Sequence, residues 1–165
     1  MRSLAVAGLC LVAATAICAI GSLIESAQPT SVICAVSAGI AFAGAATGYG
    51  AVAGSLGRAV PAAGLALLGV SASLWMVEAT LWVATGAQPA GQVLPILGVI
   101  AGGIGLALLV AAFLRAGLIP RPIGLLLAIA ACLGAISADP MVLYLLVAAP
   151  LGIALLWTTR REITQ

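Results

Sequence analysis

The chain has no lysine and no histidine, and its charge is sparse: six arginines and four acidic residues among 165. Without lysine there is no amine to form a Schiff base with retinal, and without histidine there is no imidazole to bind haem, copper or zinc. A serine or cysteine catalytic triad would lack its base for the same reason. The sequence also contains no Asp-rich magnesium motif and no glycine-rich nucleotide loop. Any chemistry must therefore rely on carboxyl groups, aromatic rings and the backbone, and we expect no metal and no cofactor.

Hydrophobic residues make up 64% of the chain, charged residues 6%, and the mean hydropathy is +1.32. A water-soluble domain of this size could not keep so apolar a surface in solution, so the composition predicts an integral membrane protein embedded in a lipid bilayer. Gly, Pro, Gln and charged residues divide the chain into six apolar runs. We therefore expect an all-α fold, in which residues 1–165 form one polytopic bundle of six transmembrane helices. The expected spans are residues 3–24, 32–54, 59–85, 93–114, 121–137 and 140–158.

The arginines fall on alternate sides of these runs. One precedes the first run, one lies between the second and third, two lie between the fourth and fifth, and two follow the sixth: Arg2, Arg58, Arg115, Arg121, Arg160 and Arg161. The other three connections contain no arginine. Under the positive-inside rule both termini are expected on the cytoplasmic side. The first run is longer than a signal peptide's apolar region, so we expect a retained helix. These features predict a multi-pass protein of the bacterial inner (cytoplasmic) membrane.

The four cysteines, Cys10, Cys18, Cys34 and Cys132, all lie in apolar runs, and no C-x-x-C pair exists. The favoured interpretation is that they are small buried hydrophobic side chains. A metal or redox site is the alternative.

Glu78 lies inside the apolar run 59–85. A carboxyl group in hydrocarbon costs about 2.5 kcal/mol or more, so an acid in this position is a functional-site hypothesis by default. Trp75 and Trp82 lie three residues before it and four after it, and Ser71 lies one turn further back. On a helix these side chains share one face. Protonation of Glu78 would remove most of the burial cost and would make the group a proton donor.

Tyr144 lies one turn into the last run, at a depth similar to that of Glu78. We therefore expect a pocket lined by acids and aromatic rings in the outer half of the membrane. Structural alternatives exist for each acid. Glu78 could hydrogen-bond a neighbouring helix, Glu25 could be a solvated loop acid, and Asp139, which precedes Pro140, could be a helix N-cap. Trp82 could be an interfacial anchor.

Three Gly-x-x-x-Gly pairs, Gly44/Gly48, Gly50/Gly54 and Gly98/Gly102, are small-residue faces that let helix backbones approach closely. They could pack helices within one chain or join copies into a homo-oligomer.

The segment Ser71-Ala-Ser-Leu-Trp-Met-Val-Glu-Ala-Thr-Leu-Trp82, with Glu25 and Asp139 as further acids near one membrane face, resembles the small integral-membrane terpene cyclases of natural-product pathways. Those proteins cyclise prenylated indoles, diketopiperazines or meroterpenoids. The resemblance implies metal-independent cyclisation of a farnesyl-type polyprenyl substrate, started by Glu78, with Glu25 or Asp139 as partner or final base. The side chains expected to bind the substrate are Trp75, Trp82, Tyr144 and Ser71. Fungal members have seven spans and are longer, whereas this chain has six apolar runs.

Two other functions fit the same residues. A small proton-coupled transporter of lipophilic cations would use Glu78 to bind a proton and an aromatic cation in turn. A non-catalytic membrane assembly subunit would need only the glycine faces. A closed cavity beside Glu78 would favour the cyclase. A cleft that reaches both membrane faces would favour the transporter. A tightly filled bundle in which Glu78 is hydrogen-bonded to a neighbouring backbone would argue against both. Nothing in the sequence suggests a nucleic-acid partner.

Overall fold

The computed structural model describes residues 2–23, 30–52, 59–86, 93–137 and 139–163. Within these ranges the chain is helical and contains no strand, which confirms the all-α prediction. The described helices begin and end within two residues of the predicted spans, except that the last continues to Ile163 and is interrupted by a π-helical turn. The elements are α1 (Arg2–Leu23), α2 (Thr30–Val52), α3 (Ala59–Thr85), α4 (Val93–Arg115), α5 (Arg121–Ser137), α6 (Pro140–Leu143), the π-helix η1 (Tyr144–Ala148) and α7 (Ala149–Ile163).

Five helical stretches in the described chain are long and apolar enough to cross a membrane. They are Arg2–Gly21, Ser31–Gly50, Ala59–Thr85, Val93–Arg115 and Pro140–Arg160. The sixth apolar helix, α5, has 17 residues. At 1.5 Å per residue it is about 26 Å long, whereas a bilayer's hydrocarbon core is about 30 Å thick.

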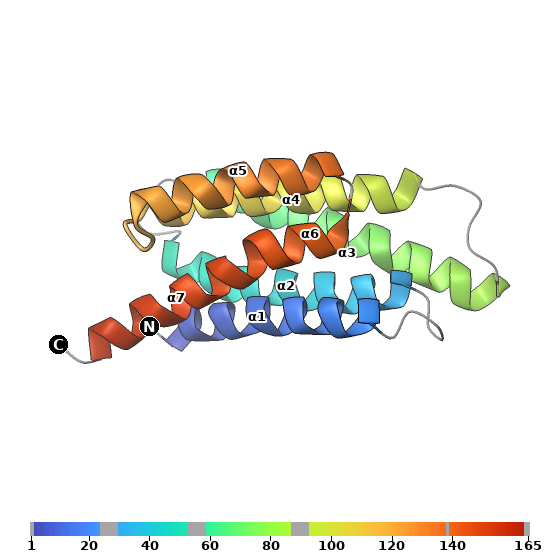
Figure 1. Ribbon diagram of the computed structural model, residues 1–165, viewed down its shortest axis with the longest axis horizontal. Coiled ribbons are helices and arrows are strands. Elements are labelled where there is room, and N and C mark those ends of the chain that lie inside the picture. Colours follow the sequence, from blue (N-terminus) through green and yellow to red (C-terminus); the bar gives the residue numbers. More distant parts are fainter. Residues whose placement is uncertain (1, 24–29, 53–58, 87–92, 138, 164–165) are drawn as a thin grey trace.

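The helices form an elongated bundle in which successive long helices run antiparallel (Figure 1). Each packs on the next from α1 to α5, and α7 packs on α1. The short α6–η1 segment contacts both α5 and α1, so the last apolar run closes the bundle. Because the connections alternate, the arginines of the described helices gather at one end, here called the arginine end: Arg2, Arg115, Arg121 and Arg160.

Glycines allow close contact between helices. A Cβ atom at Gly8 of α1 would lie 2.7 Å from the Gly152 carbonyl oxygen of α7. One at Gly64 of α3 would lie 3.0 Å from the Gly105 carbonyl oxygen of α4. The predicted pair Gly44/Gly48 packs against α1, within the chain, and Gly98/Gly102 against α3, whereas Gly50 faces open space. Gly54 lies outside the described residues.

The outer surface of the bundle is apolar. Large hydrophobic side chains are exposed on all the long helices, with Leu23 83% exposed and Ile136 80% exposed. Of the four cysteines, Cys18 and Cys34 are buried and Cys10 is half-buried, but Cys132 is exposed on α5. The expectation that all four would be buried is therefore wrong for Cys132, because its side of α5 faces away from the bundle.

Candidate functional site

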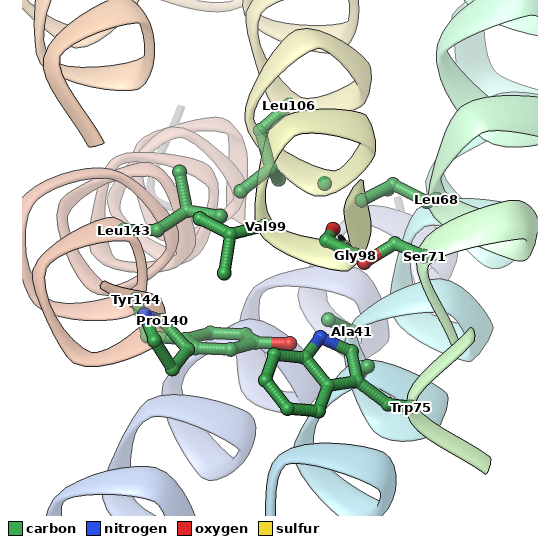
Figure 2. Close-up of a pocket in the computed structure, with 12 residues that line it drawn as sticks. Ala41, Leu68, Ser71, Trp75, Gly98, Val99, Leu106, Pro140, Leu143 and Tyr144 are labelled. Carbon is green, nitrogen blue, oxygen red and sulfur yellow. Dashed lines mark hydrogen bonds between the residues drawn. The ribbon is translucent and has the colours of Figure 1, made fainter. Parts of the chain in front are cut away.

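Three of the predicted site residues line one buried cavity in the half of the bundle away from the arginine end. Ser71 and Trp75 come from α3 and Tyr144 from the start of η1, and each is 7% exposed or less. Figure 2 shows the Tyr144 hydroxyl directed toward the Trp75 indole. The remaining walls are small or aliphatic: Ala38, Ala41, Leu68, Gly98, Val99, Gly102, Leu106, Pro140 and Leu143. The structure thus brings together side chains about 70 positions apart in sequence.

The contact between α3 and α4 sets one wall of this cavity. The Ser71 hydroxyl donates a hydrogen bond of 2.7 Å to the Gly98 carbonyl oxygen. A Cβ atom at Gly98 would lie 3.0 Å from the Trp75 indole nitrogen, and one at Gly102 would lie 3.0 Å from the Ser71 hydroxyl oxygen. The Gly98/Gly102 pair therefore makes room for an indole and a hydroxyl, in addition to letting two helices approach.

A π-helical turn presents Tyr144 to the cavity. The Ala149 amide donates to the Tyr144 carbonyl oxygen, five residues back instead of four. The Thr15 hydroxyl of α1 lies 3.2 Å from the same oxygen and 3.0 Å from the Leu11 carbonyl oxygen. Pro150 directly follows Ala149 and has no backbone N–H group, so it cannot donate a hydrogen bond to the preceding turn of the helix. Sequence reasoning did not foresee this turn, although turns of this kind are frequent at functional sites, and Pro150 is its only sequence signal.

The cavity is small. About 10 Å³ is available to the centre of a water-sized molecule, which is the room that one buried water needs. Drug-sized ligands occupy pockets of roughly 300 Å³ or more. In the form described here, the site can hold a water but not a polyprenyl chain.

Glu78 lies two turns beyond Ser71 on α3, half-buried and outside the cavity lining. Its Oε2 atom is buried and has no hydrogen-bond partner among the described residues. Leaving a buried acceptor unpaired costs about 1–3 kcal/mol. The structural alternative for Glu78 was a hydrogen bond to a neighbouring helix. Among the described residues, the Oε2 atom makes no such bond.

The other predicted residues lie apart from the cavity. Asp139 is exposed, and its Oδ1 atom accepts a hydrogen bond of 2.8 Å from the Met141 amide at the start of α6. The interpretation of Asp139 as an N-cap is therefore confirmed, whereas its role as an acid stays a prediction. Trp82 is half-buried, three residues before the end of α3. Glu25 lies outside the described residues.

Within the described ranges, no three His, Cys, Asp or Glu side chains are grouped so that they could hold a metal ion. No family model, no curated protein and no solved structure matches the chain. Any function must therefore be inferred from the site itself.

Proposed function

We propose that this protein is a membrane-embedded cyclase that acts on a lipophilic polyprenyl substrate. The observation that carries the proposal is the convergence of Trp75, Tyr144 and Ser71 on one buried cavity. Ser71 and Trp75 lie within two turns of Glu78 on α3, and the Oε2 atom of Glu78 has no hydrogen-bond partner among the described residues. A buried carboxyl group with unfilled bonding capacity, beside aromatic rings, is suited to donating a proton and holding the cation that results.

The reaction begins with transfer of the Glu78 proton to one carbon of a substrate alkene, or to an epoxide oxygen, which leaves a carbocation. A second alkene of the same chain attacks that cation and closes a ring. The faces of Trp75 and Tyr144 stabilise the positive charge. Loss of a proton to water or to a second carboxylate, Glu25 or Asp139, ends the sequence. The product is an isomer of the substrate, and exclusion of bulk water prevents early quenching of the cation.

The substrate must enlarge the cavity. Pockets that hold drug-sized ligands measure roughly 300 Å³ or more, far more than the space for one water that the cavity now offers. The wall includes three leucine side chains that could change rotamer, Leu68, Leu106 and Leu143. The proposal therefore includes an open form in which the region between α3, α4 and α6 widens around the polyprenyl chain.

The membrane placement is part of the same proposal. With six crossings, α5 included, and the arginine end facing the cytoplasm, both termini are cytoplasmic, and the Trp75 cavity lies in the outer half of the bilayer. The apolar outer surface and the one-sided arginines support this placement. A bacterial inner membrane is the expected location.

A second candidate, a transporter, is also compatible with a cavity this small. A transporter that alternates between conformations would close around an empty site, and Glu78 would then bind a proton and a lipophilic cation in turn. A non-catalytic assembly role is the third outcome that an experiment must be able to return.

The test compares wild type, Glu78→Gln and the control Glu162→Gln in membranes at equal expression, supplied with farnesylated indole or diketopiperazine substrates. Loss of a positioned general acid typically costs 10²–10⁴-fold in rate. We expect wild type and Glu162→Gln to form an isomer of unchanged mass, and Glu78→Gln to form at least about 100-fold less. Proton-dependent cation flux in vesicles, without turnover, would establish the transporter instead. If neither turnover nor cation flux is detected, the non-catalytic assembly role remains.

A further inference from the structure

Two cysteines that the cavity does not use lie together between α1 and α2. Cys18 is 2% exposed and Cys34 is 1% exposed. All four cysteines of the chain are present as thiols, and the side chains of Cys18 and Cys34 are neighbours. The sequence, in which these residues are 16 positions apart in different apolar runs, gave no indication of a pair.

The packing of α1 on α2 fixes this pairing. Gly21 lies against Ile33, and Cys10 lies against Gly44. In an antiparallel pair with that register, Cys18 lies level with residue 36, two residues from Cys34 and so within about 3 Å of it along the helix axis. The packing on both sides of the pair therefore keeps the two buried cysteines at nearly the same level of adjacent helices.

A further polar group accompanies the pair. Ser37 is one turn from Cys34 on α2, is fully buried, and its hydroxyl has no hydrogen-bond partner among the described residues. The structure therefore has a second polar side chain buried one turn from Cys34 on α2.

We propose that Cys18 and Cys34 are a redox-active pair that closes reversibly to an intramolecular disulfide in the folded bundle. A metal ion fits less well, because no third ligand of the usual kinds joins the pair within the described ranges. Two thiolates on a monovalent soft ion would also leave a net negative charge in an apolar interior, which is costly. A disulfide is neutral.

The chemistry balances with a lipid-soluble two-electron oxidant such as a quinone. One S–S bond forms, two S–H bonds break, and the two protons and two electrons reduce the quinone to a hydroquinone. Water-soluble oxidants are excluded by the burial of both sulfurs. The disulfide would tie α1 to α2 one turn beyond Thr15, whose hydroxyl contacts the Tyr144 carbonyl oxygen, and so beside the Trp75 cavity.

The experiment needs no substrate, so its outcome is independent of the proposed cyclase. Purified Cys10→Ser/Cys132→Ser protein, which keeps only the pair, is treated in lipid nanodiscs with a lipid-soluble short-chain quinone. Remaining thiols are then counted with a maleimide after denaturation. We expect both thiols to disappear together, with a mass decrease of two hydrogens and no covalent dimer, and to return on reduction.

Two controls give the result its meaning. Cys18→Ser in the same background should keep its single thiol and its mass. In the four-cysteine chain, peptide mapping should show Cys18 joined to Cys34 and not to Cys10 or Cys132. Elution as a single folded species before treatment guards against misfolding. Two thiols that stay maleimide-reactive after full oxidant treatment, or a different pairing in the native chain, would overturn the proposal.

Discussion

At the scale of single residues, the Ser71 hydroxyl links the two helices that hold the cavity. It bonds across to α4, whereas the exposed Ser73 hydroxyl bonds only to the Gly69 carbonyl oxygen of its own helix. Hydrogen bonds between membrane helices contribute about 0.6 kcal/mol on average and at most about 1.7 kcal/mol. We expect Ser71→Ala to lower the free energy of unfolding by about this amount, measured by denaturant titration in mixed micelles.

Ser73→Ala is the matched control and should leave the midpoint unchanged. Equal losses from the two variants would mean that the bond to Gly98 contributes nothing beyond a helix's internal bonding.

Glu78 gives a second prediction at this scale. Its Oε2 atom is buried and has no hydrogen-bond partner among the described residues. Replacing the side chain by leucine would remove this unsatisfied acceptor, which costs about 1–3 kcal/mol. We expect Glu78→Leu to unfold at the same temperature as wild type or a higher one, while any activity is lost. A residue kept for function at a cost in stability behaves in this way. A marked drop in thermal midpoint would instead show that Glu78 holds the bundle together.

At the scale of elements, substitutions of Asp139 at the start of α6 can distinguish its role as a helix cap from a role as a catalytic acid. Asparagine caps helices as well as aspartate does but is no acid, whereas alanine does neither, and loss of a cap costs about 1 kcal/mol. We expect Asp139→Asn to keep wild-type stability and Asp139→Ala to lose about 1 kcal/mol, as followed by thermal unfolding in detergent. If turnover is found, loss of activity in both variants would assign Asp139 an acid–base role in addition to the cap.

The contact between α1 and α7 leads to a prediction about glycine. An alanine at Gly8 would place its Cβ 2.7 Å from the Gly152 carbonyl oxygen, whereas one at Gly39 would meet nothing within 4 Å. Overpacking typically costs about 1–3 kcal/mol, and glycine in a helix interior is about 1 kcal/mol worse than alanine.

We therefore expect Gly8→Ala to destabilise the protein and Gly39→Ala to leave it unchanged or more stable. Both are compared by thermal unfolding at matched detergent concentration. The opposite order would contradict the close approach of α1 and α7.

The helices themselves could be predicted from the sequence, but their irregularities could not. Runs such as 59–85 and 121–137 are bounded by charged, Gly and Pro residues, and the described helices begin and end there. The π-turn at Tyr144–Ala148 involves one extra residue in a helix that is apolar throughout, so no change in hydrophobic pattern marks it. The Thr15 hydroxyl that bonds the Tyr144 carbonyl oxygen comes from 129 positions away, and no local sequence pattern connects the two residues.

The same division holds for the site. Helical spacing was enough to place Ser71 and Trp75 on one face, and depth was enough to place Tyr144 near them. The size of the cavity depends on how leucines of three elements interdigitate, and the Cys18–Cys34 pair depends on the register of α1 against α2. Both are properties of packing between helices, which spacing along one helix does not specify.

At the scale of the whole molecule, the one-sided arginines predict a topology that fusions can test. We expect green fluorescent protein placed after Gln165 to be bright and alkaline phosphatase at the same point to be inactive, because the proposed topology places both termini in the cytoplasm. Alkaline phosphatase fused after Gln92, beyond α3, should be active. Active alkaline phosphatase after Gln165 would indicate an odd number of membrane crossings. The simplest cause would be that α5 lies along the membrane surface instead of crossing it.

The Gly8–Gly152 contact also has a consequence for biogenesis. These residues belong to the first and last long helices described, so the contact between α1 and α7 can form only after α7 has left the ribosome. Until then α1 must wait beside its earlier neighbours with Gly8 and Thr15 turned toward lipid or toward the insertion machinery. A nascent chain that lacks α6, η1 and α7 would stay in that unfinished state, without Gly152 and without the Pro140, Leu143 and Tyr144 side of the cavity.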